Sequence, residues 1–206
     1  MFAAAIFYAD DMCVLSPSLR GLQKLLNACS SYCTEWDICL NVNKTKNMYF
    51  GKNLSFDFRP TLNDTPIDWV KEWKYLGVTL KSGRRFCCSI TERVKSFYCS
   101  LNSILRVEGR SDDMLMLQLI ETHCIPILTY AIEIIHMANQ DERRSLRVAY
   151  NSVYRKLFGY RIFESVTQLQ HSLKRSTWEE LVDGRRSGFL KRARSFDPDT
   201  LVRAFC

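Results

Sequence analysis

Two adjacent carboxylates, Asp10 and Asp11, interrupt the apolar run "IFYADDMCVL" at residues 6–15. Like charges side by side repel each other, and an unpaired carboxylate is costly to bury. The apolar residues on either side predict two short strands, 2–8 and 12–16, that meet at a polar turn. The sequence therefore predicts an antiparallel hairpin with both aspartates at its exposed tip.

The rest of the chain divides into a mixed front and a helical rear. Apolar spacing near 3.6 predicts an amphipathic helix over 18–40, and the segments 47–51 and 73–80 indicate strands separated by turn residues. After Gly83 the pattern is helical, with about five helices expected, and Gly159 is a predicted stop. Four capping patterns predict helix starts, at Ser89, Asn139, Ser165 and Ser176. The predicted fold class is α+β.

The 206 residues carry a net charge of +7, and 47% of them are hydrophobic, enough for a real core. The segment from Asn139 onward holds 14 Lys+Arg against 8 Asp+Glu, whereas residues 1–138 hold 15 against 14. A basic chain of this size favours a polyanionic partner, most simply nucleic acid, although many basic proteins bind nothing in particular.

The cysteines and the apolar runs bear on the compartment. Nine cysteines without a regular framework indicate free thiols in a reducing compartment. The N-terminus lacks the pattern of a signal peptide, and no uncharged run reaches the ~18 residues of a membrane span. We therefore expect an intracellular protein without a membrane partner, with nucleus and cytoplasm not distinguished.

Paired carboxylates on a rigid hairpin suit a hard divalent cation such as Mg²⁺. Two such ions about 3.5–4 Å apart clamp the attacking and leaving oxygens in phosphoryl transfer. The alternative is a hairpin tip without a metal, because Asp is a favoured turn residue.

Four segments together resemble one family. "FYADD" resembles the catalytic hairpin of the reverse-transcriptase palm, and "LNVNKTKNMYF" is similar to the motif that follows in non-LTR (LINE-type) retrotransposon polymerases. "WKYLGVTL" resembles their primer-grip hairpin, and "LRVAYNSVYRKLFG" resembles their thumb and connection region. The resemblance implies an RNA-directed DNA polymerase that uses two Mg²⁺ ions to add deoxynucleotides to a primer 3′ hydroxyl.

The resemblance also implies residue roles. Asp10 and Asp11 would be the metal ligands, and Lys44 and Lys46 would help to neutralise the leaving phosphate. Tyr8 and Ala9 would pack under the primer terminus. The implied primer-holding residues are Trp73, Lys74, Tyr75, Leu76 and Gly77.

Each of these assignments has a structural alternative. Lys44 and Lys46 could be solvated loop charges. Trp73 and Tyr75 could simply belong to the core, and Gly77 could only mark a bulge.

The resemblance predicts a partial palm over 1–83, made of antiparallel hairpins and one helix, and an all-α thumb and connection region over 84–206. A further aspartate and the fingers of such polymerases lie upstream of the hairpin, which here begins within ten residues of Met1. We therefore expect a fragment that is inactive alone, with the missing palm and fingers, an RNA template and a DNA primer as partners. The edge of residues 2–8 is expected to be unpaired and prone to self-association.

The basic rear supports a second function. Arg185, Arg186, Lys191 and Arg192 are expected to contact phosphates, giving weak, salt-dependent binding to a duplex without Mg²⁺. The alternative functions are thus a non-catalytic nucleic-acid-binding module built from the thumb helices, or a structural helical protein with a chance acidic hairpin.

Overall fold

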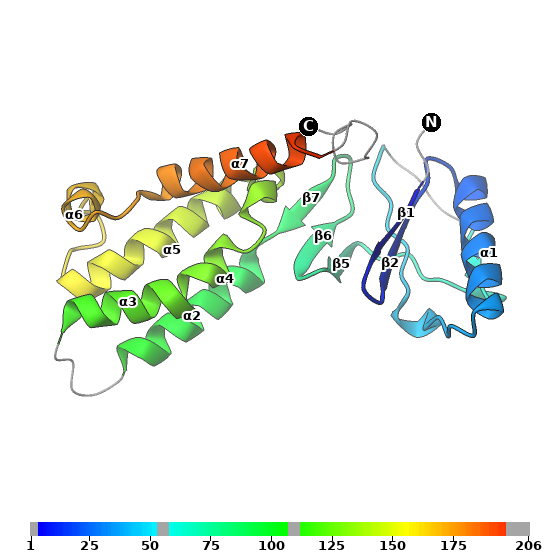
Figure 1. Cartoon of the computed structure of the whole chain (residues 1–206), viewed down its shortest axis with the longest axis horizontal. Helices are drawn as coiled ribbons and strands as arrows, with labels where there is room; N and C mark the ends of the chain where they lie inside the picture. Colours follow the sequence, from blue (N-terminus) through cyan, green and yellow to red (C-terminus); the bar gives the residue numbers. More distant parts are fainter. Residues whose placement is uncertain (1–3, 53–57, 107–111, 197–206) are drawn as a thin grey trace. The chain divides into compact units, whose positions relative to one another are not determined.

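The computed structural model describes residues 4–52, 58–106 and 112–196, and its fold is α+β as expected (Figure 1). The front elements are β1 (Ala4–Tyr8), β2 (Asp11–Leu15), α1 (Leu19–Glu35), the 3-10 turn η1 (Val42–Lys44), β3 (Thr61–Leu62), β4 (Thr65–Pro66), β5 (Glu72–Tyr75), β6 (Val78–Lys81) and β7 (Cys87–Ser89). The rear elements are α2 (Thr91–Leu105), α3 (Asp113–His123), α4 (Ile125–Thr129), the 3-10 turn η2 (Ile132–Met137), α5 (Gln140–Phe158), α6 (Thr167–Ser172) and α7 (Trp178–Arg194).

The chain forms two compact units, and each contains residues from more than one stretch of sequence. The first consists of the described residues of 1–75 together with 80–86. The second consists of 76–79 and the described residues from 87 onward. The correspondence of these units to a palm and a thumb stays a prediction.

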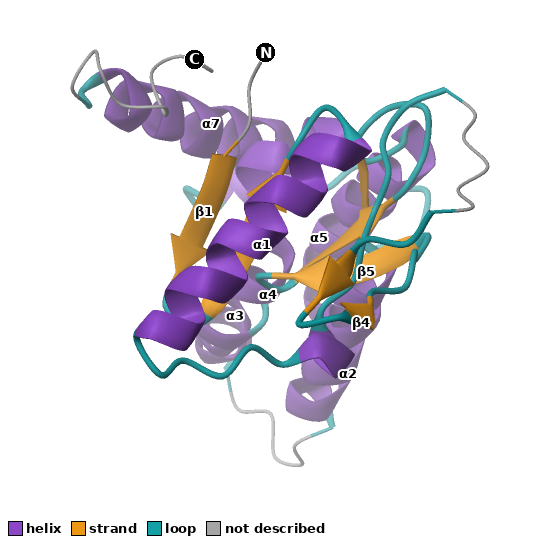
Figure 2. Cartoon of the chain, turned by 90° about the vertical axis from the view of Figure 1, so that its right-hand side faces the viewer, coloured by secondary structure: helices purple, strands orange, loops and turns teal. Residues whose placement is uncertain are grey.

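The first unit is built on the β1–β2 hairpin and α1 (Figure 2). Ser18 caps α1 by accepting a hydrogen bond from the Gly21 amide at 3.1 Å. Helix α1 contacts β2 and β3, and Leu26 forms a small core with Leu62 and Ile67. Because only a few side chains are fully buried here, this core holds the hairpin with limited apolar area.

The second unit is a helical cluster with a larger core. Helix α2 contacts α3, α4 and α5, and α5 also contacts α7. The core side chains without exposed area are Phe97, Leu101, Leu117, Ile120, Cys124, Leu128, Leu146 and Ala149. Phe97 and Leu101 belong to the apolar stripe that the sequence predicts on α2, so the helical period is confirmed there.

Two predicted helix boundaries are confirmed. Asn139 caps α5 by accepting a hydrogen bond from the Glu142 amide at 2.7 Å. Gly159 ends the same helix with φ 71°, the left-handed conformation that glycine tolerates.

Other local predictions are wrong. Residues 47–51 form no strand and contribute two isolated bridges, Asn47–Trp69 and Phe50–Gly83. The cap of α7 is Thr177 instead of Ser176. Ser89 ends a strand and does not cap α2, and the residue at the cap of α6 is Val166.

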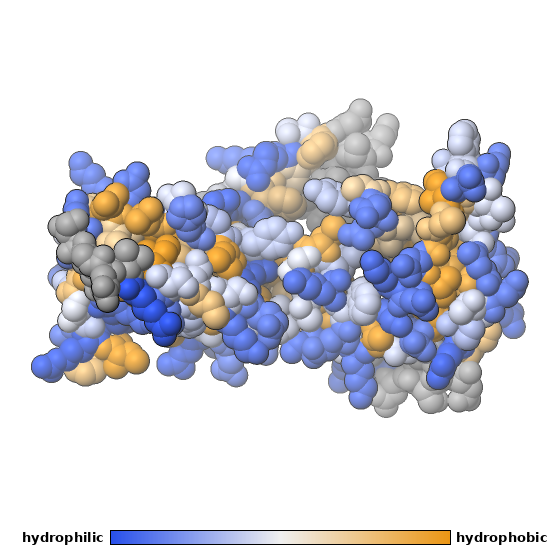
Figure 3. All heavy atoms as spheres, turned by 90° about the horizontal axis from the view of Figure 1, so that it is seen from below, coloured by the Kyte–Doolittle hydropathy of each residue, from blue (hydrophilic) through white to orange (hydrophobic). Residues whose placement is uncertain are grey.

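None of the helices in the described ranges is long and apolar enough to cross a bilayer. The eight cysteines of those ranges are free thiols. Hydrophobic side chains reach the surface in several places on the face drawn in Figure 3.

Candidate functional site

The predicted acidic hairpin is confirmed. Strands β1 and β2 pair in antiparallel register from Ala4 with Leu15 to Tyr8 with Asp11. This register leaves Ala9 and Asp10 as a two-residue loop, and Ala9 has φ 51°. A positive φ at the first loop position matches the twist of a tight hairpin but is strained for a residue with a Cβ. Asp10 therefore lies at the tip, and Asp11 is the first residue of β2.

Both carboxylates are exposed, and neither makes a hydrogen bond or ion pair with another described residue. Exposed, unshared carboxylate oxygens fit the ligand preference of Mg²⁺. Among the described residues no cluster of three or more His, Cys, Asp or Glu side chains surrounds them. The hairpin can thus supply part of a metal site, with the remaining ligands coming from water, nucleic acid or another polypeptide segment.

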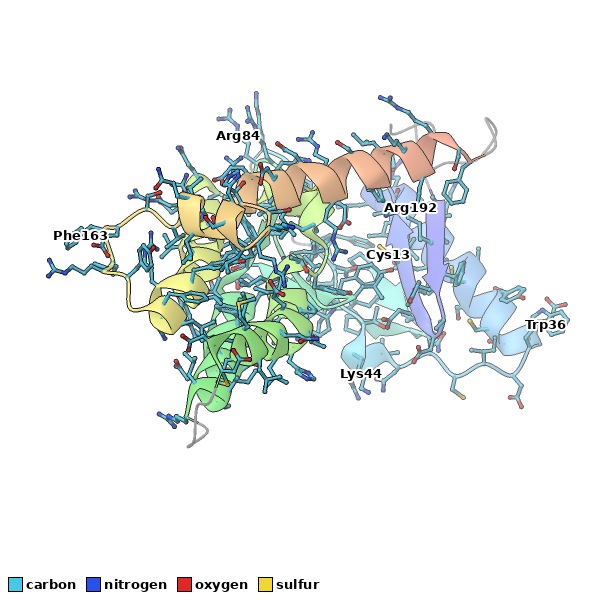
Figure 4. The ribbon with its side chains drawn as sticks, turned by 60° about the vertical axis from the view of Figure 1, so that its left-hand side comes forward. Cys13, Trp36, Lys44, Arg84, Phe163 and Arg192 are labelled. Carbon is cyan, nitrogen blue, oxygen red and sulfur yellow. The ribbon has the colours of Figure 1, made fainter. Side chains whose placement is uncertain are left out.

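Tyr75 of β5 brings the primer-grip-like segment near the hairpin within the first unit. Its hydroxyl is buried and has no hydrogen-bond partner in the described part of the chain. Burial raises the pKa of the Tyr75 phenol, and the nearby Cys13 and Asp11 raise this pKa further. Cys13 lies on β2 (Figure 4), two residues after Asp11, so the two side chains share one face of the strand.

The two candidate lysines differ in whether a carboxylate pairs with them. Lys44 ends η1 with an exposed side chain (Figure 4). The Lys46 ammonium lies 3.2 Å from the Asp68 carboxylate, and Arg59 approaches the same carboxylate at 3.4 Å. Lys46 is therefore already engaged by a carboxylate, which leaves Lys44 as the better placed of the pair to meet a phosphate.

The five primer-grip candidates are divided between the two units. Trp73 is 37% exposed and Lys74 is exposed, so Trp73 is not a core residue. Leu76 and Gly77 have φ 45° and 75° and form the turn between β5 and β6. Gly77 is thus a tight-turn glycine and does not mark a bulge.

The four basic candidates lie on α7 with exposed side chains, namely Arg185, Arg186, Lys191 and Arg192. Figure 4 labels Arg192 on this helix. They make no hydrogen bond or ion pair within the described part of the chain, so their charge is free for a partner.

Tyr130, which follows α4, makes two contacts that no local sequence pattern predicts. Its hydroxyl donates a hydrogen bond to the Leu76 carbonyl oxygen at 2.7 Å, within the second unit. The Arg93 guanidinium carbon lies 5.9 Å from the centroid of the Tyr130 ring. The positive φ of Ala131, 47°, turns the chain directly after this tyrosine.

Comparison with known proteins adds family information to this geometry. Residues 3–80 match the family described as reverse transcriptase (RNA-dependent DNA polymerase). The chain is 27% identical over 198 residues to the "Probable RNA-directed DNA polymerase from transposon BS" of Drosophila melanogaster, which covers 91% of this chain and 22% of that protein. It is 26% identical over 176 residues to the "RNA-directed DNA polymerase from mobile element jockey" of Drosophila funebris, covering 81% and 19% respectively.

The chain spans about a fifth of the length of these curated relatives. No solved structure matches it significantly.

Proposed function

We propose that this chain, whose residues 3–80 match the reverse-transcriptase family, is the part of a non-LTR retrotransposon polymerase that carries the acidic hairpin, the primer-gripping turn and a duplex-holding helical region. The observation that carries the proposal is the two-residue hairpin with exposed Asp10 and Asp11, which lies inside the matched segment. The parent reaction is the addition of deoxynucleotides to a primer 3′ hydroxyl on an RNA template.

In this proposal Asp10 and Asp11 supply carboxylate oxygens to Mg²⁺, which stabilises negative charge during nucleotidyl transfer when bound. Tyr8 and Ala9 lie beside the primer terminus, and the Leu76–Gly77 turn with Trp73 and Lys74 orients the primer strand. Lys44 supports the leaving phosphate electrostatically, whereas Lys46 stays in its ion pair with Asp68.

The proposal is tested by metal-directed cleavage, which does not require polymerase activity. Fe²⁺ in place of Mg²⁺, with ascorbate and peroxide, cuts nucleic acid close to the metal site. An RNA–DNA hybrid with a recessed primer is expected to be cut near the primer 3′ end. Asp10→Asn combined with Asp11→Asn should abolish this cut.

Asp64→Asn is the matched control, because Asp64 is also an exposed aspartate in a two-residue turn, with φ 59°. It should leave the cut unchanged. Cleavage spread evenly along the hybrid, or cleavage unaffected by the double hairpin variant, would contradict the placement of the primer end at the hairpin.

The isolated 206-residue chain is expected to give no primer extension with Mg²⁺ or Mn²⁺. Two carboxylates from one hairpin leave most coordination positions of a divalent ion without a protein ligand. Extension that Asp10→Ala removes would show that this polypeptide alone is a sufficient polymerase.

A second candidate function is duplex binding without catalysis, and the exposed basic group on α7 favours it. Arg185, Arg186, Lys191 and Arg192 offer donors to phosphates, and such contacts release counterions. Binding to an RNA–DNA hybrid should weaken steeply with salt, be indifferent to sequence and persist without Mg²⁺.

Reversal of the four α7 charges to Glu should lower both the affinity and the salt slope. The control reverses an equal number of exposed charges in the first unit, at Arg20, Lys24, Lys52 and Lys71. Equal losses in the two variants would indicate a response to net charge alone and remove α7 as the binding surface.

A further inference from the structure

Arg93 is a half-buried cation for which the described part of the chain supplies no acidic partner. It lies in the first turn of α2, and its guanidinium makes no hydrogen bond or ion pair with the described residues. The carboxylates of that region are used elsewhere. Glu92 pairs with Lys95 at 2.8 Å, and Glu142 accepts hydrogen bonds from Ser89 and Thr91.

The position of Arg93 is electrostatically unfavourable for a residue with only a structural role. A positive charge in the first turn of a helix opposes the helix dipole, and burial of an unpaired charge adds a desolvation cost. Burial lowers the pKa of Arg93, and Cys88 and Tyr130 offset this lowering only in part. The face of the Tyr130 ring is the compensating contact, with a centroid distance of 5.9 Å.

Tyr130 joins this cation to the turn between β5 and β6. Its hydroxyl holds the Leu76 carbonyl at 2.7 Å. Its ring lies so close to Gly77 that a Cβ there would be 3.0 Å from the ring atom Cε1. Gly77 thus lets the ring approach the turn, and all of these residues belong to the second unit.

We propose that Arg93, oriented by the Tyr130 ring, binds a backbone phosphate of the nucleic-acid strand that the Leu76–Gly77 turn holds. A phosphodiester offers the oxygens that a guanidinium binds in bidentate fashion, and it supplies the negative charge that the surroundings of Arg93 lack. This inference rests on the proposed function for the identity of the strand, but the anion site itself depends only on Arg93 and Tyr130.

The first measurement is a salt titration of binding to an RNA–DNA hybrid with a recessed primer. Arg93→Gln should weaken binding roughly tenfold at low salt and make the salt slope shallower by about 0.9, the value for one lost phosphate contact. Arg20→Gln removes the same charge from an exposed arginine on α1 and should leave both quantities nearly unchanged.

The second measurement locates the phosphate. Replacement of single primer phosphates by neutral methylphosphonate should reveal one position near the 3′ end that weakens binding by the wild-type chain. The same replacement should cause no further loss in Arg93→Gln, because the contact is already absent. Equal sensitivity of both proteins at every position would overturn the inference.

Variants of the neighbouring tyrosine separate orientation from general stability. Tyr130→Phe keeps the ring under the guanidinium and should retain the methylphosphonate effect. Tyr130→Leu removes the ring and should behave like Arg93→Gln. Arg93→Lys keeps the charge, so it should retain the salt slope while losing preference for one phosphate position, and it remains informative if Arg93→Gln unfolds.

Failure of the polymerase proposal would be recognised separately. If the wild-type chain binds no hybrid, inorganic phosphate is titrated while the side-chain Nε–H resonance of Arg93 is followed by NMR. A saturable shift of Arg93, absent for Arg20, supports the anion site without the polymerase. No shift, together with no hybrid binding, would overturn the inference.

Discussion

Gly77 is the residue at which backbone conformation and side-chain size act together. Its φ of 75° disfavours any residue with a Cβ, and the added carbon would also press on the Tyr130 ring at 3.0 Å. Gly159 has a nearly equal φ, 71°, but has no atom within 4 Å of the position of an added Cβ. Substitution of the two glycines by alanine therefore separates the free-energy cost of a positive φ from the cost of steric contact with the ring.

Gly159→Ala is expected to lower the free energy of unfolding by about 1 kcal/mol, the usual cost of a left-handed alanine. Gly77→Ala should cost about 2 kcal/mol or more, because the ring must also shift. Urea unfolding followed by far-UV circular dichroism measures both. Equal losses would show that the Tyr130 ring accommodates the added carbon at no further cost.

Ala9 offers the opposite experiment, because there the strained residue already carries a Cβ. With φ 51°, Ala9→Gly should stabilise the chain by about 0.5–1 kcal/mol, since relief of strain exceeds the entropy cost of glycine. Ala5→Gly in the middle of β1 is the control and should be destabilising. A loss of stability in Ala9→Gly would contradict the strained hairpin tip.

Among the helices, α7 has the most complete N-terminal cap. Thr177 Oγ1 accepts a hydrogen bond from the Glu180 amide at 3.3 Å, and the Glu180 carboxylate accepts one from the Thr177 amide at 2.8 Å. The backbone hydrogen bond lowers the pKa of Glu180 below its ordinary value of 4.5. This helix also carries the four basic candidates, so the residue at which it begins determines where they lie along it.

The lowered pKa gives α7 a defined response to acid. A group with a depressed folded pKa stabilises the folded state above its ordinary pKa, and this stabilisation is lost as the pH falls through the folded pKa. The start of α7 should therefore fray as the pH falls below about 4.5. Amide exchange at Thr177 measures this fraying.

Two variants test the origin of the acid response. Glu180→Gln should remove the pH dependence, because an amide does not titrate in this range. Glu179→Gln, which alters only the neighbouring carboxylate that approaches Arg147 at 3.4 Å, should retain it. If Glu180→Gln frays in acid as the wild type does, the acid response comes from a titratable group other than Glu180.

The elements that could be predicted from the sequence are those specified by their own residues. The β1–β2 hairpin, the period of α2 and the stop at Gly159 each follow from a local pattern, and all three are confirmed. The predicted cap at Ser89 is wrong because its hydroxyl donates to Glu142, 53 residues away, at 2.8 Å. A capping pattern of four residues carries no information about such long-range contacts.

The candidate site shows the same division. The acidic pair and the turn at Leu76–Gly77 are marked by their own sequences, whereas the pairing of Lys46 with Asp68 depends on segments 22 residues apart. Tyr130 reaches Leu76 across 54 residues, and nothing in "LTYAIE" marks it. The positions of the motif residues could thus be predicted from the sequence, whereas the contacts that orient these residues could not.

At the scale of the whole molecule, the two units differ in how well they cover their apolar surface. The helical unit buries side chains from α2, α3, α4, α5 and α7, whereas β1 of the first unit pairs with β2 alone among the described strands. Ile6, Phe7 and Tyr8 are 45%, 65% and 66% exposed. An unpaired edge with exposed apolar side chains favours association with further strands.

We therefore expect concentration-dependent self-association of the isolated chain through β1. Phe7→Ser should reduce the oligomer fraction measured by light scattering. Phe163→Ser is the control, because Phe163 is 77% exposed and lies in the connection between α5 and α6 (Figure 4). A chain that stays monomeric at high concentration, or equal effects of the two substitutions, would contradict association through β1.

The route of the chain through its two units has a practical consequence for dividing it. The polypeptide passes from one unit to the other after Tyr75, after Thr79 and after Phe86. A single cut that releases the helical unit whole, after Tyr75, therefore also takes residues 80–86 away from the first unit. A recombinant piece that begins at Cys87 would lack Leu76–Thr79, and Tyr130 would lose the carbonyl that its hydroxyl holds. A faithful helical piece has to begin before Leu76 and carry β6 with it.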